Sequence, residues 1–188
     1  TGISYETAYD LKDTDSLDPW QDLADGCYAL DVLTQADSID ELNEELDVDA
    51  ALWFMATESV LVDDDGYINK GGYDFYVYYD VATDRIVPIE FDGNSAFYTR
   101  RAYSWAPLRR HDDPRYALMY RLVAIPELRQ RYLAHFRTVM AESLEPEIAE
   151  GLIDTYYDLI KDSVYAAEIS QYSNEKFEEG IIELKEFL

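Results

Sequence analysis

Cysteine and histidine are scarce in this chain of 188 residues, which has one cysteine, Cys27, and two histidines, His111 and His135. A single cysteine excludes an internal disulfide framework. Neither histidine has a partner at a spacing typical of a metal site, and no Gly-x-Ser-x-Gly segment is present. These absences disfavour disulfide-stabilised folds and hydrolases that use a Ser-His-Asp arrangement.

Basic residues are also few, with 15 Lys and Arg against 40 Asp and Glu and a net charge of -25. Such a charge argues against nucleic acid or an anionic membrane surface as a partner, because both are polyanions. For most of the acids we prefer solubility in a salty environment as the explanation. No apolar run is long enough for a membrane span, and no signal-peptide pattern opens the chain. Because Thr1 is not a usual first residue, we expect a fragment of a longer protein.

Apolar and aromatic residues, in contrast, are plentiful. Hydrophobic residues make up 48% of the chain and aromatics 14%, including 17 tyrosines, so disorder is not expected. The length suits one domain with a real core, which we place over residues 1–188. Helix signals dominate the pattern and one hairpin signal interrupts them, so we expect a mainly α fold with a small β-hairpin (α+β). The expected helices start near Pro19 and Ile39, cover 50–61, flank Pro126 within 115–140, and cover 145–165 and 173–188.

The most informative stretch runs from Glu58 to Phe97. An acidic loop, Asp63-Asp64-Asp65-Gly66-Tyr67, precedes a strand-like run over 73–79, a turn over 80–84 and a second run over 85–91. If the two runs pair as a hairpin, Asp74 falls near Glu90, with the register uncertain by a residue or two. Alternation places Val87, Ile89 and Phe91 on one face of the second run, and Glu90 and Asp92 on the other.

Crowded carboxylates at one end of this hairpin predict a metal site. Neighbouring carboxylates repel one another, and the negative end of the helix over 50–61 adds to the repulsion. A hard cation that prefers oxygen ligands, such as magnesium, resolves it, with Asp74, Glu90 and Asp92 as the expected ligands. A calcium-holding or simply solvated hairpin end is the alternative. Lys70 either neutralises the cluster or reaches a phosphate, or it is a salt-bridging surface lysine. Glu58 either supports the loop or is a plain surface glutamate.

The stretch also resembles the CotH kinase family, named for spore coat protein H. The matching segments are the Asp-Gly-Tyr of the acidic loop, the aromatic strand Tyr76-Val77-Tyr78 with its neighbours, and Pro88-Ile89-Glu90-Phe91-Asp92. Members of this family resemble divergent protein kinases. The resemblance implies a kinase-like carboxy-terminal lobe, with Asp65 as the catalytic aspartate and Asp74, Glu90 and Asp92 binding magnesium. Lys70, from its place between the loop and the strand, is the candidate for a contact with ATP. It covers about Tyr9 to residue 165 and leaves no room for an upstream nucleotide-holding lobe, which we expect to lie outside this chain.

Three departures from the family pattern keep an alternative open. Asp63 and Asp74 stand where the family usually has Asn, and Ile89-Glu90 stands where it usually has Trp-Asp. By resemblance, the expected function is magnesium- and ATP-dependent phosphoryl transfer to a hydroxyl of an unknown protein substrate, in an exported or cell-envelope protein. The alternative is a non-catalytic surface or structural module. A basic cluster that includes Arg100, Arg101, Arg109 and Arg110 either binds phosphate or an acidic peptide or, as we slightly prefer, docks on the acidic remainder of the protein.

Overall fold

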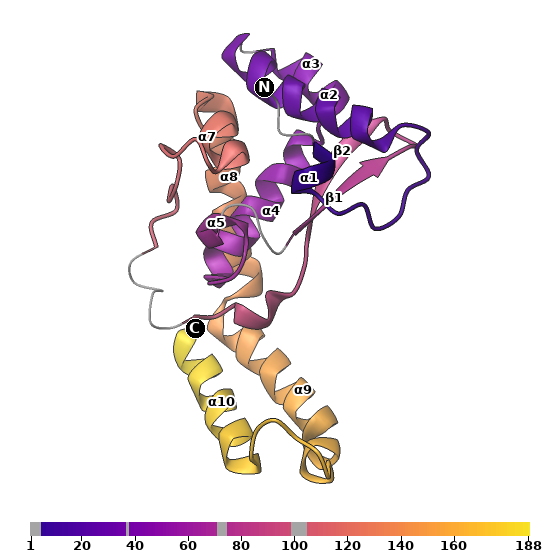
Figure 1. The fold of residues 1–188 in the computed structure, drawn as a ribbon. Coiled ribbons are helices and arrows are strands. Elements are labelled where there is room, and N and C mark those ends of the chain that lie inside the picture. Colours follow the sequence, from indigo (N-terminus) through magenta and orange to yellow (C-terminus); the bar gives the residue numbers. More distant parts are fainter. Residues whose placement is uncertain (1–4, 37, 71–74, 99–104) are drawn as a thin grey trace. The chain divides into compact units, whose positions relative to one another are not determined.

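The computed structural model describes residues 5–36, 38–70, 75–98 and 105–188 of the chain. The chain divides into two compact units, residues 1–136 and 137–188. The first unit holds the predicted hairpin and the acidic loop, so it is the unit that bears on function (Figure 1). As expected, the described part is mainly helical with one two-stranded antiparallel sheet. None of its helices combines the length and the apolar character that a membrane crossing needs.

The first unit begins with helices whose starts follow the predicted signals. Pro19 opens α2 and the Asp18 carboxylate accepts from the amide of Gln21 at 3.3 Å, as an N-cap should. The helix after Ser38 also forms as predicted, although the Ser38 side chain makes no capping hydrogen bond. The elements are α1 (Tyr5–Ala8), α2 (Pro19–Val32), the 3-10 turn η1 (Leu33–Ala36) and α3 (Ile39–Glu45).

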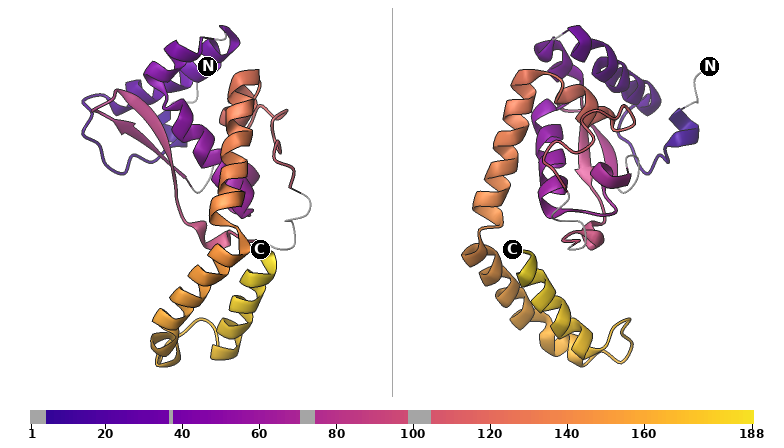
Figure 2. Two further views of the ribbon diagram at one scale, coloured as in Figure 1. Left: turned by 180° about the vertical axis from the view of Figure 1, so that it is seen from behind. Right: turned by 90° about the vertical axis from the view of Figure 1, so that its left-hand side faces the viewer.

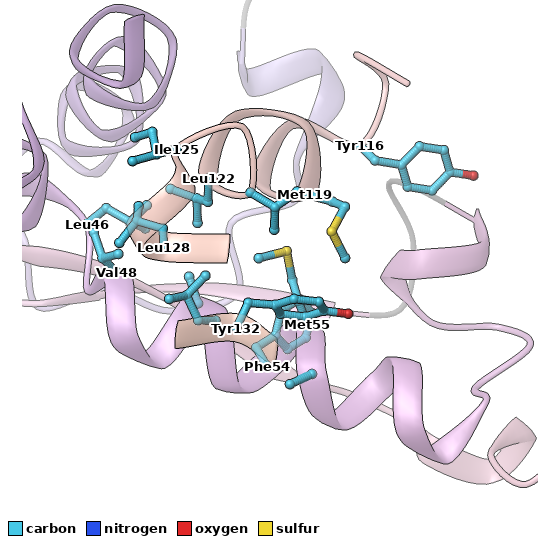
Figure 3. Packing of buried hydrophobic residues seen from close by; sticks show 14 of the residues in the cluster. Leu46, Val48, Phe54, Met55, Tyr116, Met119, Leu122, Ile125, Leu128 and Tyr132 are labelled. Carbon is cyan, nitrogen blue, oxygen red and sulfur yellow. The ribbon is translucent and has the colours of Figure 1, made fainter. Parts of the chain in front are cut away.

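Helix α4 (Val48–Leu61) is the centre of the first unit, as its nearly unbroken apolar sequence predicts. Asp47 caps its start by accepting from the amide of Ala50 at 3.0 Å. Met55 of α4 is fully buried and shares a core with Met119 and Leu122 of α7 (Ala117–Leu122) and with Leu128 of α8 (Pro126–Thr138). Figure 3 shows these side chains facing one another. The two helices on either side of Ile125-Pro126 are as predicted.

The hairpin joins this core with side chains from both of its strands. Strands β1 (Phe75–Asp80) and β2 (Arg85–Glu90) pair antiparallel, with Phe75 opposite Glu90. Ile86 and Pro88 form the buried face of β2, whereas Ile89 and Phe91 are exposed. The backbone of Ile86 accepts from the amide of Asp47 at 2.9 Å, which ties the hairpin to the start of α4. Glu90 lies on the same face as Ile86 and Pro88, and this face rather than the Val87, Ile89 and Phe91 face packs on the protein.

Two helices form most of the second unit. They are α9 (Pro146–Tyr165), preceded by the π-helical turn η3 (Val139–Ser143), and α10 (Asn174–Phe187). They lie side by side and antiparallel (Figure 2), with the rings of Tyr157 and Phe177 stacked 5.7 Å apart. Both helices match the predicted ranges closely, and we assign them no chemistry.

Candidate functional site

The acidic loop starts where α4 ends, and the side chain of its first aspartate, Asp63, stabilises the backbone of the loop. Val62 closes the helix with φ 51° and ψ 54°, a left-handed conformation that a β-branched residue rarely adopts. Asp63, only 3% exposed, follows it. One oxygen of Asp63 accepts from the amides of Asp65 at 3.0 Å and Gly66 at 3.3 Å. This carboxylate therefore shapes the turn and positions Asp65.

Glu58 supports the second half of the same loop from inside the protein. It is 1% exposed, and its two carboxyl oxygens accept from the amides of Tyr67 at 3.0 Å and Ile68 at 2.9 Å. These amides open the short helix α5 (Tyr67–Lys70), where helical amides lack partners of their own. The four consecutive amides of residues 65–68 are thus held by two buried carboxyl groups.

Glu58 also meets Glu90, which reaches it from the end of β2. The Glu90 residue is exposed overall, but its carboxyl group hydrogen bonds with the buried Glu58. Burial, and then the charge of Glu90, raises the pKa of Glu58 to about 9, against the two amide hydrogen bonds. Burial also raises the pKa of Glu90, and repulsion from Asp63 adds to this, although the hydrogen bond with Glu58 opposes it. Because two carboxyl groups hydrogen bond to each other only when one keeps its proton, a proton relieves part of the predicted charge crowding.

Asp65, the predicted catalytic residue, is partly exposed at the rim of the loop. Its carboxylate forms an ion pair with the ammonium group of Lys70 at the end of α5. The side chains are 32% and 47% exposed, so solvent reaches both. This pair is expected both of a lysine that neutralises the cluster and of a salt-bridging surface lysine, so it does not decide between these interpretations.

Asp92, a predicted metal ligand, lies on the segment that borders the acidic loop. The amide of Asp64 donates to the carbonyl oxygen of Ser95 at 3.1 Å, and the amide of Phe97 donates to that of Leu61 at 2.6 Å. Asp92 precedes the 3-10 turn η2 (Gly93–Ser95) with φ 57°, a left-handed conformation that Asp tolerates better than most residues. Its carboxylate is exposed and has no partner among the described residues, so it is available to a ligand.

The predicted metal set is only partly described. Asp74 lies outside the described residues, and within the ranges that the structure covers no three His, Cys, Asp or Glu side chains are placed to hold a metal ion. Asp63 and Glu58 bind backbone amides, and Lys70 pairs with Asp65. The described carboxylates therefore coexist through donors of the protein itself, so the charge argument for a metal is weaker than the sequence suggested.

The described part of the basic segment after the hairpin belongs to the first unit and contacts other residues of it. The Arg109 guanidinium lies 5.0 Å from the centre of the Trp105 ring and donates to the side chain of Asn69 at 3.2 Å. Asn69 in turn donates to the carbonyl oxygen of Asp64 at 2.6 Å. Arg110 stacks over Tyr116 at 4.7 Å. These partners are aromatic rings and an amide rather than carboxylates, so docking on the acidic remainder stays a prediction, and Arg100 and Arg101 lie outside the described residues.

Sequence reasoning gave Glu58 no more weight than a plain surface glutamate, although the signal was present. Helix α4 is apolar nearly all round, so a polar residue within it is expected to be buried and paired. Glu58 also stands one helical turn before the loop that it supports.

Similarity to known proteins is found at the level of a family. No curated protein and no solved structure matches the chain. The family model described as CotH kinase protein matches residues 2–188, a longer range than the segment from Tyr9 to about residue 165 that carried the sequence resemblance. Because this match covers essentially the whole chain, the protein belongs to the CotH kinase family.

Proposed function

We propose that this chain carries the catalytic half of an atypical protein kinase, which transfers phosphate from ATP to a hydroxyl group of a protein. The observation that carries the proposal is the fixed acidic loop. Asp65 is presented to solvent on a turn whose amides are held by Asp63 and Glu58, and the exposed Asp92 lies on the neighbouring segment. A fixed carboxylate, with a second, unpaired one on the segment that borders the loop, suits a reaction that depends on positioning and on charge.

Asp65 would orient the acceptor hydroxyl and take its proton. Its partial exposure gives a substrate access, and its carboxylate pairs with Lys70. Lys70 extends from the short helix α5, which follows the acidic loop. When Lys70 leaves Asp65, its ammonium group can contact a phosphate. The roles of the two residues in transfer are therefore linked, because each is the other's partner before substrate binds.

The donor chemistry of the site fits magnesium. Glu90 and Asp92 offer carboxylate oxygens of the kind that a hard cation prefers, and Asp74 would complete the set. Magnesium, when bound, neutralises charge on the phosphates of ATP. Within the protein, Glu90 is the ligand that connects this set to the loop, since its carboxyl group contacts Glu58.

Two measurements on the natural full-length protein test the proposal. Isothermal titration measures magnesium-ATP binding, and transfer of radiolabel from ATP to protein measures catalysis. Asp65→Asn keeps the size of the side chain but removes its basicity, so we expect label transfer to fall about 100-fold or more with nucleotide binding retained. Asp84→Asn, in the turn at the other end of the hairpin, removes the same charge and should leave transfer unchanged.

Two experimental outcomes would contradict the proposal, in whole or in part. If the natural protein binds no magnesium-ATP and transfers no label, the enzymatic proposal is wrong and a non-catalytic module of the envelope or cell surface replaces it. If binding and transfer occur but Asp65→Asn is fully active, the kinase activity stands and the assignment of Asp65 does not.

A further inference from the structure

A pocket of 350 Å³ in the first unit is lined mainly by basic and uncharged residues. His111, Arg121 and Arg129 line it together with Tyr120, and no Asp or Glu is among the described residues that do. The chain as a whole has 40 acidic and 15 basic residues, so a lining of this kind is unusual for it. None of the predicted site residues Asp65, Lys70, Glu90 and Asp92 lines the pocket.

Arg129 is held in place by the end of a helix. Its Nε donates to the carbonyl oxygen of Val123 at 2.7 Å, and Val123 follows the last residue of α7. Carbonyl groups at a helix end lack helical partners, so this bond satisfies one of them and fixes the guanidinium plane. Both terminal nitrogens of Arg129 are without a partner among the described residues, and they can donate in parallel to a planar or tetrahedral anion.

Arg121 brings a second guanidinium to the same pocket. It pairs with Asp31 and lies 5.3 Å from the centre of the Tyr120 ring. The Asp31 side chain is 60% exposed, and exposed ion pairs of this kind add little stability. A guanidinium has five N–H donors, so Arg121 can bind a second anion without losing Asp31.

We propose that this pocket binds a phosphate group. Two guanidinium groups at one small pocket match a doubly charged tetrahedral anion better than a singly charged carboxylate. The strongly negative chain repels anions at long range, so binding must depend on these local hydrogen bonds and not on general attraction. The site is independent of phosphoryl transfer, because it uses none of the residues assigned to that reaction.

Titration of the full chain with sodium phosphate, followed by amide NMR spectra at constant ionic strength, tests the proposal. We expect saturable shifts at Val123 and Ala124 with a Kd on the order of 1 mM, and binding of acetate about tenfold weaker. A parallel titration with glycerol 2-phosphate tells whether the pocket takes free phosphate alone or also a phosphate monoester. Either result agrees with a phosphate site.

Matched variants distinguish phosphate binding in the pocket from a nonspecific effect of the positively charged side chains of the protein. Arg129→Gln should weaken phosphate binding about tenfold, the effect of losing a charge-assisted hydrogen bond. Arg121→Gln should weaken it as well, and it leaves the bond to Val123 intact if Arg129→Gln disturbs folding. Arg131→Gln is the control, because Arg131 lies on the same helix and pairs with Glu127. Absence of saturable shifts, equal affinity for acetate, or equal weakening by Arg131→Gln would overturn the proposal.

Discussion

Gly66 lies directly against the carboxyl group of Glu58: a Cβ atom on Gly66 would stand 3.0 Å from both Cδ and Oε1 of Glu58. Such a distance is tighter than ordinary contact, and the carboxyl group cannot retreat while its oxygens accept from Tyr67 and Ile68. The glycine of the Asp-Gly-Tyr sequence is therefore needed by a buried group as well as by the turn.

Substituting Gly66 by alanine should destabilise the first unit. The added methyl group forces either the loop or Glu58 to move, an overpacking effect that typically costs about 1–3 kcal/mol. Urea unfolding followed by circular dichroism measures it. Gly93→Ala is the control, since a Cβ there meets nothing within 4 Å. Equal stability of the two variants would show that Glu58 and Gly66 are not in contact.

Removing the Glu58 carboxyl group should be more damaging than replacing it by an amide of nearly the same size. Glu58→Ala leaves two buried amides without an acceptor, and each unsatisfied group costs about 1–3 kcal/mol. Glu58→Gln retains one acceptor oxygen and nearly the same volume, so we expect about half that loss. Unfolding free energies of both variants against Glu41→Ala, an exposed position on α3, provide the comparison. A variant order with Gln equal to or worse than Ala would contradict the two-amide arrangement.

The sequence anticipated the scaffold better than the site. Helix starts at Pro19 and after Asp47 carry their capping residues in the sequence, and the hairpin carries its alternation, so local chemistry alone locates them. The short helix α5 was missed because its first two residues rely on Glu58, nine and ten positions earlier in the chain, for their amide partners. The repulsion among carboxylates that suggested a metal is smaller than the sequence indicates. The protein itself supplies backbone amides, a shared proton and Lys70 to these carboxylates, and none of these contacts can be read from the sequence.

The contribution of the buried Tyr132 hydroxyl to the free energy of unfolding should decrease at alkaline pH. This group donates to the carbonyl oxygen of Pro107 at 2.5 Å and lies 3.1 Å from Ser59 Oγ. Burial raises the pKa of Tyr132 to about 12, against a smaller opposing effect of Ser59. Because the folded state holds the proton more strongly than the unfolded chain does, the contribution is complete below about pH 10 and is lost as pH rises towards 12.

The measurement compares unfolding free energies of the natural chain and of Tyr132→Phe between pH 8 and pH 11. At pH 8 the phenylalanine variant should be less stable by about 1 kcal/mol, the net value of a hydrogen bond. The difference should shrink above pH 10, since only the tyrosine protein loses stability through this group. A constant difference across the range would refute the raised pKa.

One substitution of Lys70 tests both its ion pair with Asp65 and its proposed contact with ATP. We expect it to weaken nucleotide binding while the stability of the protein changes little. Its ion pair with Asp65 is partly exposed, and such pairs contribute about 1 kcal/mol or less. Lys70→Gln should therefore change the urea midpoint little. If Lys70 contacts a phosphate of ATP, the same change should weaken magnesium-ATP binding to the natural full-length protein about tenfold.

Lys12→Gln is the matched control for this last experiment, since Lys12 is also paired with an aspartate, Asp10, on an exposed stretch of chain. It should alter neither stability nor nucleotide binding. A large loss of stability in Lys70→Gln with unchanged nucleotide affinity would assign Lys70 to the support of the acidic loop alone. In that case the phosphate contact of the proposed kinase site would have to come from another residue, while the role of Asp65 in transfer would be unaffected.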